Sequence, residues 1–129
     1  MTTIKDVAWS FFELINRGRL ADAYAVFDDS GTWWNSLDRK ILPMVRMKEV
    51  GQRIIEKMPL KFSLINLFQD GNVVIIECES HLVLADDRLY NNVYTFMFTF
   101  RDNKVMHVRE HADTKYTVDM LSKEIWDVQ

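Results

Sequence analysis

The clearest pattern of hydrophobic and polar positions lies at residues 89–114. Aromatic residues alternate with small or polar ones over residues 89–101, and residues 104–112 return in extended, partly alternating form. Asp102-Asn103 between the two runs is typical of a tight turn. The pattern therefore predicts a long β-hairpin, around which the rest of the chain is organised.

A two-residue loop at Asp102-Asn103 fixes the register expected for this hairpin. The facing pairs are then Phe100 with Val105, Phe98 with His107, Phe96 with Arg109, Tyr94 with His111 and Asn92 with Asp113. One face grades from apolar at the turn to polar at the far end, which favours an apolar pocket with a few polar groups. We expect the pocket to be lined by four residues of this face, Asn92, Tyr94, Phe96 and His111.

Helical spacing dominates the first part of the chain. Apolar residues recur at helical intervals from Ile4 to Ile15, Thr2 or Thr3 can cap the helix together with Asp6, and residues 16–18 end it. We expect a second helix at residues 20–27, a turn at 28–31, a short strand at 32–35 and a loop at 36–43. A third helix is predicted at residues 47–58 and ends before a proline.

The remaining segments complete an antiparallel meander. Residues 60–69 and 72–84 predict two long strands ahead of the hairpin, and a last helix is predicted at residues 116–126 from Val118, Leu121, Ile125 and Trp126. Helices followed by long strands indicate an α+β fold. Because long strands twist, we expect one domain, residues 1–129, with a strongly curved, cone-shaped antiparallel or mixed sheet around the N-terminal helices, as in a cystatin-like α+β roll.

The convex face of such a sheet is expected to be semi-apolar. Its outward residues are predicted to be Thr95, Met97, Thr99, Met106 and Val108. Because a monomer would leave this surface as an exposed patch, we expect a homodimer that forms through the sheet.

Charge and cysteine content narrow the range of partners. Sixteen Lys and Arg against nineteen Asp and Glu give a net charge of −3 without a basic run, so neither nucleic acid nor an anionic membrane is expected as a partner. The apolar N-terminal stretch contains Asp6 and Glu13, so we expect neither a signal peptide nor a membrane span. Cys78 is the only cysteine, which excludes an internal disulfide and favours a cytoplasmic location. The three histidines form no helical metal motif, so no metal is expected. The chemistry expected for the chain needs no cofactor.

Two phrases carry a family resemblance, DDSGTWWNSLDRKILP early and YNNVYTFMFTFRDNKVMHVREHADT late. Together with the order of elements, they resemble the nuclear transport factor 2-like superfamily, in particular its SnoaL-like polyketide cyclases and the related limonene epoxide hydrolases. The resemblance covers nearly the whole chain. It implies the cone-shaped fold, and it identifies fold better than reaction.

The resemblance also implies site residues. Asp113 matches the aspartate that acts as acid or base in the cyclases and hydrolases, and Asn35 matches an asparagine that holds the attacking water in the hydrolases. Trp33 stands where those hydrolases have a tyrosine, and Cys78 and Ser80 stand where they have an arginine and an aspartate. Epoxide hydrolysis by that mechanism is therefore not expected.

Each candidate also has a structural interpretation. Asp113 would equally serve as the cap of the last helix, and His111 as a half-buried histidine. Adjacent tryptophans on one strand cannot both point inward, so either Trp33 or Trp34 faces the pocket. Glu79 and His81 share one strand face, which lies either beside Asn92 and Tyr94 or in solvent at the rim of the cone.

The pattern as a whole favours a protein that binds a small apolar or polycyclic molecule. Cofactor-free proton transfer, of an isomerase or cyclase kind, would use Asp113 as the base together with Asn35. The first alternative is a non-catalytic member that binds a ligand or a protein through the same cone or sheet, with a pocket filled by Trp33, Tyr94 and Phe96. The second alternative is a small subunit of a ring-hydroxylating dioxygenase-like assembly.

Overall fold

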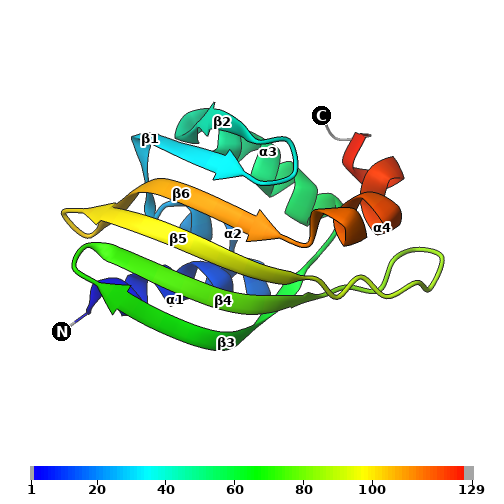
Figure 1. The fold of residues 1–129 in the computed structure, drawn as a ribbon, viewed down its shortest axis with the longest axis horizontal. Helices are drawn as coiled ribbons and strands as arrows, with labels where there is room; N and C mark the ends of the chain where they lie inside the picture. The colour runs from blue at the N-terminus through cyan, green and yellow to red at the C-terminus, as the bar shows by residue number, and fades with distance from the viewer. Residues whose placement is uncertain (1, 127–129) are drawn as a thin grey trace.

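The computed structural model describes residues 2–126, with side chains described for residues 2–122. Three helices, α1 (Ile4–Asn16), α2 (Leu20–Tyr24) and α3 (Met44–Lys57), lie behind a curved sheet, and α4 (Thr114–Trp126) follows the last strand (Figure 1). The sheet consists of β1 (Phe27–Asn35), β2 (Lys40–Pro43), β3 (Lys61–Asp70), β4 (Val73–His81), β5 (Val93–Arg101) and β6 (Lys104–Ala112). The predicted α+β fold is confirmed.

The six strands follow the order β2-β1-β6-β5-β4-β3. β1 and β6 run parallel, and all other neighbours are antiparallel, so the sheet is mixed. β2 and β3 are edges that do not meet, and the curved sheet stays open. α1 and α3 pack against its concave face, as expected for a sheet that wraps around the helices.

The start of α1 is as the sequence predicts. The Thr3 hydroxyl accepts a hydrogen bond from the Asp6 amide at 3.1 Å, and the Asp6 carboxylate accepts one from the Thr3 amide at 3.0 Å. This reciprocal capping box satisfies two amides that the first helical turn leaves without partners. At the other end, Gly18 has a φ of 75°, a conformation that stops the helix at low cost.

Some boundaries differ from those expected. α2 ends at Tyr24, and β1 begins at Phe27 and runs through the residues expected to form a separate turn. The Asp28 carboxylate accepts hydrogen bonds from the amide and hydroxyl of Ser30, so this local turn becomes an irregularity within β1. The expected loop at 36–43 contains β2, α3 begins at Met44, and the 82–92 connection leaves the sheet with a single bridge, Val83 to Leu89.

A β-bulge in β6 changes the register of the central hairpin. Phe100 pairs with Val105 as expected, but Thr99 then pairs with His107, so Met106 is an extra residue on β6. Beyond this point the observed pairs are Phe98 with Val108, Phe96 with Glu110, Thr95 with His111 and Tyr94 with Ala112. The expected pairs that placed His107, Arg109 and His111 opposite the inward aromatic residues are therefore wrong, because one extra residue exchanges the two faces of a strand.

The bulge also corrects the outer face expected for the sheet. Val108 is fully buried in the core, and Met106 is also buried, so neither belongs to an exposed convex surface. The bulge lies against β1 at Gly31, where a Cβ atom would come within 1.8 Å of the Met106 carbonyl oxygen. Only glycine fits this close approach of two backbones.

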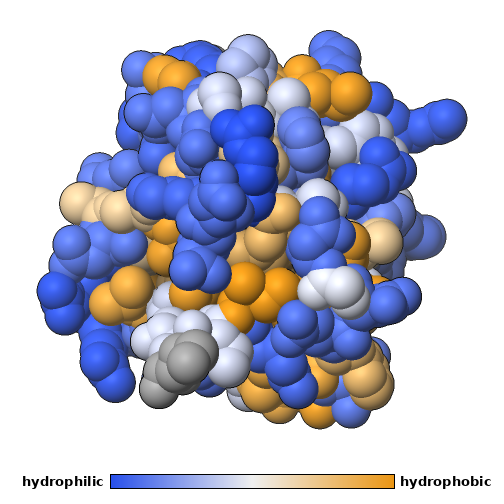
Figure 2. Space-filling model, turned by 90° about the vertical axis from the view of Figure 1, so that its left-hand side faces the viewer, coloured by the Kyte–Doolittle hydropathy of each residue, from blue (hydrophilic) through white to orange (hydrophobic). Residues whose placement is uncertain are grey.

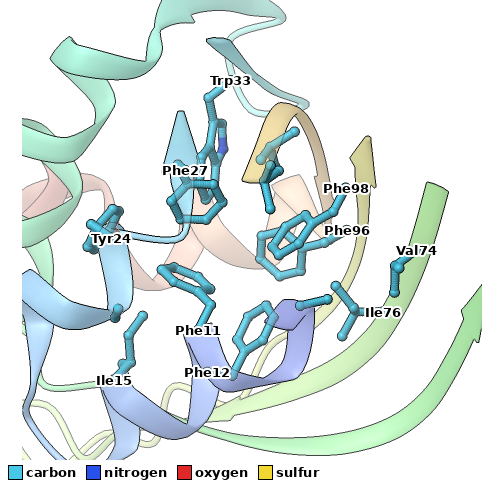
Figure 3. Close-up of a cluster of buried hydrophobic side chains, with 14 of the residues drawn as sticks. Phe11, Phe12, Ile15, Tyr24, Phe27, Trp33, Val74, Ile76, Phe96 and Phe98 are labelled. Carbon is cyan, nitrogen blue, oxygen red and sulfur yellow. The ribbon is translucent and has the colours of Figure 1, made fainter. Parts of the chain in front are cut away.

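The core lies between α1 and the concave face of the sheet. Figure 3 shows Phe11 and Phe12 of α1 directed at Phe27 and Trp33 of β1 and at Phe96 and Phe98 of β5. The ring centroids of Phe11 and Phe27 are 4.9 Å apart in an edge-to-face arrangement, which favours aromatic pairs beyond burial alone. A second buried cluster, built from Met58, Leu84, Tyr90 and Leu121, joins the 82–92 connection to α4.

The two ends of the molecule differ. The end with the N-terminus and the β3–β4 and β5–β6 turns is largely hydrophilic, with hydrophobic side chains showing between the polar ones (Figure 2). At the other end, Leu121 of α4 is buried and Val118 is exposed, so the predicted helix packs through Leu121. The side chains of Ile125 and Trp126, which completed the predicted stripe, lie outside the described residues.

Candidate functional site

The concave face of the sheet, α3 and the first turns of α4 enclose a cavity with two adjoining lobes. Their volumes are about 170 Å³ and about 130 Å³. Residues shared by both lobes come from five segments and are mostly apolar: Trp33, Asn35, Met47, Ile54, Leu60, Tyr94 and Glu110. An apolar cavity with a few convergent polar groups is the usual form of a small-molecule site.

Glu110 is the carboxylate that lines both lobes. It faces inward because the bulge at Met106 turns this position of β6 toward Phe96, its cross-strand partner. Its side chain keeps some exposure through the cavity, but protein atoms surround it, and this desolvation raises its pKa to about 7. A hydrogen bond from Trp33 acts in the opposite direction, and the charge of Asp38 adds to the rise.

Trp33 fixes the position of this carboxyl group. Its indole Nε1 donates a hydrogen bond to Glu110 Oε1 at 2.9 Å. Within residues 2–122, the other oxygen, Oε2, has no hydrogen-bond partner. One oxygen is thus held by the protein, while the other remains available to a molecule in the cavity.

Asn35 lies beside Glu110 at the end of β1. Its Oδ1 accepts a hydrogen bond from the Leu37 amide at 2.8 Å, which orients the side chain. Its amide nitrogen has no partner in the part of the chain whose side chains are described. Asn35 therefore offers the cavity a hydrogen-bond donor close to a carboxylate.

Three hydroxyl groups line the larger lobe across from α3. The Tyr90 hydroxyl lies 3.2 Å from that of Tyr94 and 3.3 Å from that of Thr117. Burial raises the pKa of Tyr94 well above its ordinary value, so this phenol stays protonated. A protonated phenol in an apolar wall is a hydrogen-bond donor for a ligand oxygen.

Asn92 supports these hydroxyls from behind. It is 1% exposed, and its Nδ2 donates to the Tyr90 hydroxyl and to Thr117 Oγ1, both at 2.9 Å. The Thr117 hydroxyl donates onward to the Asp113 carbonyl oxygen at 3.0 Å. Tyr90 and Ser80 are both hydrogen-bond partners of the Tyr94 hydroxyl. When both donate to it, the Tyr94 hydrogen is available to a molecule in the cavity.

Some of the residues that the sequence predicted for the site line the cavity, and others do not. Trp33, Asn35 and Tyr94 line both lobes and Phe96 lines the smaller one, whereas Asn92 lies behind the wall. Of the two adjacent tryptophans, Trp33 is the inward one.

Asp113 and His111 lie elsewhere. Asp113 is exposed, and its Oδ1 accepts a hydrogen bond from the Tyr116 amide at 3.1 Å, so it caps α4. His111 is on the outer face, where its ring centroid is 5.0 Å from that of Trp34. The prediction that the side chains of Asp113 and His111 face Asn92 and Tyr94 was wrong, because it assumed a hairpin without the β-bulge at Met106.

Glu110 is the site residue that the sequence reasoning missed. It lies within the phrase Arg109-Glu110-His111, and simple alternation from the turn assigned it to the outer face. The signal for a bulge is weak here, because Val105 and Met106 are both apolar and either could face the core. Glu79 and His81 are half exposed on the outer face of β4, whereas Cys78 and Ser80 point inward and are buried.

The other reactive groups give no second site. Burial raises the pKa of the Cys78 thiol to about 12, so it remains protonated in the core. Among the described residues, no three His, Cys, Asp or Glu side chains gather as metal ligands would. No helix within 2–126 is long and apolar enough to cross a membrane.

Comparison with known proteins agrees with this architecture. The family model of the SnoaL-like domain matches residues 9–108. UPF0523 protein C of Dictyostelium discoideum is 27% identical over 95 residues, which make up 66% of this chain. The chain spans 61% of the length of that relative.

Solved structures share the fold at low sequence identity. IdmH, a proposed polyketide cyclase from Streptomyces antibioticus, matches with a TM-score of 0.79 at 13% identity, over 93% of this chain and 99% of IdmH. A nuclear transport factor 2-like protein of unknown function from Cytophaga hutchinsonii matches with a TM-score of 0.72 at 12% identity, over 89% of this chain and 94% of that one. Because the family model matches residues 9–108, the chain belongs to the SnoaL-like domain family, and its fold is that of the nuclear transport factor 2-like protein from Cytophaga hutchinsonii.

Proposed function

We propose that the chain binds a small, neutral, mostly apolar carbonyl compound and transfers a proton on it without a cofactor, with Glu110 as the base. The observation that carries this proposal is the position of Glu110, which lines both lobes with one oxygen free. A carboxyl group whose pKa is about 7 exchanges protons readily near neutral pH. The cyclase activity proposed for IdmH, which shares the fold, is in keeping with such chemistry.

The size of the cavity limits the ligand. A closed apolar cavity of about 150 Å³ accommodates one benzene ring. The lobes, at about 170 Å³ and about 130 Å³, therefore favour a molecule with one or two rings over a larger polycyclic one. The apolar lining and the lack of a cationic side chain shared by both lobes favour a neutral molecule.

The polar groups suit a carbonyl compound with an acidic C–H bond. Tyr94 is a diagonal neighbour of Glu110 across β5 and β6, because Phe96 lies directly opposite Glu110. Diagonal cross-strand residues lie about 7–8 Å apart, with their Cβ atoms somewhat closer, which leaves room for a carbonyl group and its adjacent carbon between the two side chains. The Tyr94 hydroxyl would donate to the carbonyl oxygen while Glu110 faces the C–H bond.

The reaction is then a proton shift. Glu110 Oε2 takes the proton from the carbon next to the carbonyl, and the electron pair of the broken C–H bond moves to give an enolate whose oxygen is stabilised by Tyr94. Glu110 returns the proton to the same carbon or to another carbon of the conjugated system. The second outcome is an isomerisation, and neither outcome needs an oxidant or a reductant.

Deuterium exchange tests this step. With 2-tetralone, a two-ring ketone, in D₂O at pH 8, we expect the protein to accelerate loss of the α-proton NMR signal. Glu110→Gln should lower this acceleration by about 100- to 10,000-fold, as for removal of a positioned base. Glu13→Gln, which removes an exposed carboxylate on α1, is the matched control. If Asp113→Asn abolishes exchange while Glu110→Gln does not, Asp113 is the base and the assignment of Glu110 fails.

A non-catalytic ligand-binding protein is the second candidate. Cys78 and Ser80 favour it, because the related epoxide hydrolases have an arginine and an aspartate at these positions. Quenching of tryptophan fluorescence by two-ring ketones, with loss of quenching in Trp33→Phe, would show binding to the cavity. Binding without accelerated exchange would establish this second function.

A further inference from the structure

One buried hydroxyl group of the smaller lobe comes from a helix rather than from the sheet. Tyr24, the last residue of α2, is 3% exposed, and its side chain lines this lobe. The ring centroids of Phe11 and Phe27 lie 5.2 Å and 5.9 Å from that of Tyr24, so the aromatic cluster fixes the position of the ring. Figure 3 shows Tyr24 on the opposite side of this cluster from Ile76.

The Tyr24 hydroxyl has no hydrogen-bond partner within residues 2–122. The hydroxyls of the other three tyrosines, Tyr90, Tyr94 and Tyr116, are all hydrogen-bonded. Buried hydroxyls are paired in the great majority of proteins, because an unpaired one loses its hydration without compensation. The unpaired hydroxyl of Tyr24 therefore indicates a partner that enters the lobe.

α3 leaves space for this hydroxyl at the wall of the lobe. A Cβ atom on Gly51, in the middle of α3, would lie 2.3 Å from the Tyr24 hydroxyl oxygen. Gly51 also lines the smaller lobe. Glycine disfavours the interior of a helix, but at this position any larger residue would displace the phenol. The contact between the two residues thus keeps the hydroxyl at the lobe.

We infer that Tyr24 forms a second oxygen-binding subsite, in which it donates a hydrogen bond to a neutral oxygen of the ligand. The inference rests on the proposed function, in which the carbonyl group of the ligand lies between Tyr94 and Glu110. Those two residues belong to the sheet, whereas Tyr24 belongs to the helical wall of the same lobe. The ligand is then a compound with two oxygens, the carbonyl oxygen and a hydroxyl, ether or second carbonyl oxygen beside Tyr24.

The charges around the smaller lobe favour a neutral second group. Among the described residues, no Lys, Arg or His side chain lines this lobe, whereas Glu110 does. A carboxylate or phosphate of the ligand would therefore meet a negative charge without a cation to balance it. Burial raises the pKa of Tyr24 well above its ordinary value, and the charge of Glu110 adds to the rise. The phenol keeps its hydrogen and acts as a donor.

Matched pairs of two-ring ketones test the subsite. The 5-, 6-, 7- and 8-hydroxy isomers of 2-tetralone carry one neutral oxygen at different points of the second ring, and the corresponding methyl compounds have similar size without that oxygen. Titration calorimetry at pH 7 should give the parent a dissociation constant at least about tenfold lower for one hydroxy isomer than for its methyl analogue. In Tyr24→Phe the difference should fall below about twofold. No preference at any of the four positions, or a preference that Tyr24→Phe leaves unchanged, overturns the inference.

Tyr116→Phe is the matched control, because its hydroxyl has partners and lines neither lobe. The Tyr116 hydroxyl accepts a hydrogen bond from the Asn91 amide at 3.1 Å and donates one to the Leu89 carbonyl oxygen at 3.2 Å. Tyr116→Phe should keep the ligand preference and unfold at a lower urea concentration than the parent. Tyr24→Phe should unfold at the same urea concentration as the parent or at a higher one. A midpoint lowered as in Tyr116→Phe would show that the Tyr24 hydroxyl is paired within the fold, and the subsite would be wrong.

Deuterium exchange separates this inference from the proposed function. Accelerated exchange of 2-tetralone without a preference for any hydroxy isomer keeps Glu110 as the base and overturns the Tyr24 subsite. A preference that Tyr24→Phe removes, without accelerated exchange, keeps the subsite and overturns Glu110 as the base. If no tetralone binds, both the carbonyl ligand and its second oxygen are wrong.

Discussion

Trp33 donates its indole hydrogen to Glu110 Oε1 across 2.9 Å, so the most bulky side chain of the cavity wall holds its central carboxyl group. The two residues come from β1 and β6, the one parallel pair of strands in the sheet. The hydrogen bond favours the ionised carboxylate, while burial favours the neutral acid. The balance between the two sets the pH at which Glu110 changes charge.

Trp33→Phe should therefore raise the pKa of Glu110 above about 7, by about one pH unit if the lost hydrogen bond contributes about 1.4 kcal/mol. Phenylalanine keeps much of the apolar surface but has no donor. The midpoint is measured by ¹³C NMR titration of the labelled Glu110 carboxyl carbon, with no ligand present. Trp34→Phe, on the outer face, is the control and should leave the midpoint unchanged. An equal midpoint in the parent and Trp33→Phe would contradict the role of this hydrogen bond.

Glu110 should make the fold less stable as the pH rises. Its pKa is about 7 when folded and about 4.5 when unfolded, so between these values the folded state binds more protons and stability falls with increasing pH. The contribution is fully present below about pH 4.5 and lost by about pH 7. The full difference corresponds to about 3 kcal/mol, and exposure through the cavity reduces it.

Glu110→Gln removes this dependence because glutamine does not titrate. We expect the variant to be about 1–3 kcal/mol more stable than the parent at pH 8 and nearly equal to it at pH 4.5, in urea unfolding at both values. A variant of equal or lower stability at pH 8 would argue against a desolvated carboxyl group. Gain of stability with loss of exchange would identify Glu110 as a functional residue rather than a structural one.

Asn92→Ala should be strongly destabilising. The side chain is buried and its amide donates to Tyr90 and Thr117, so truncation leaves two hydroxyls without their donor and opens a small cavity. Loss of such a buried network costs about 2–4 kcal/mol, measurable as a lower urea midpoint. The neighbouring Asn91 is exposed, and Asn91→Ala should change stability by less than about 0.5 kcal/mol. A similar loss of stability in Asn92→Ala and Asn91→Ala would show that the buried hydrogen-bond network adds little to the stability of the fold.

Gly31→Ala should also destabilise the fold, by about 2–4 kcal/mol. The added Cβ would approach the Met106 carbonyl oxygen to 1.8 Å, so either β1 or the bulge must shift. Gly71→Ala provides a comparison, since its φ of 58° is strained for alanine but no atom lies within 4 Å of the new Cβ. That change should cost about 1 kcal/mol. The reverse order of the two effects would rule out a tight contact at Gly31.

The order of elements could be predicted because it rests on local patterns. Helical spacing from Ile4, the Thr3 cap and the turn at Asp102-Asn103 each act within a few residues, and each is found in the structure. The outward Trp34 and inward Trp33 follow from strand alternation once the register with β6 is known. Local sequence does not contain that register.

The site was predicted only in part for the same reason. Tyr94 and Phe96 are large, mostly apolar residues whose inward position is decided by burial, so alternation finds them, whereas alternation alone does not choose between Trp33 and Trp34. Glu110 and His111 are both polar, and which of them enters the cavity depends on one extra residue four or five positions earlier. The family phrase pointed to Asp113, which the structure uses as a helix cap.

The single-residue bulge at Met106 makes the chemistry of the cavity depend on chain length rather than on side-chain identity. Deleting Met106 would restore plain alternation of inward and outward side chains along β6. From the deleted position to the start of α4, residues that now face the cavity would face outward, and outward residues would face the cavity. The carboxyl group of Glu110 would turn to solvent, and the positions of Arg109 and His111 would turn toward the aromatic core. A lineage could therefore replace an acid by a cationic or imidazole group in one step, with the helices, the strand order and most of the core kept.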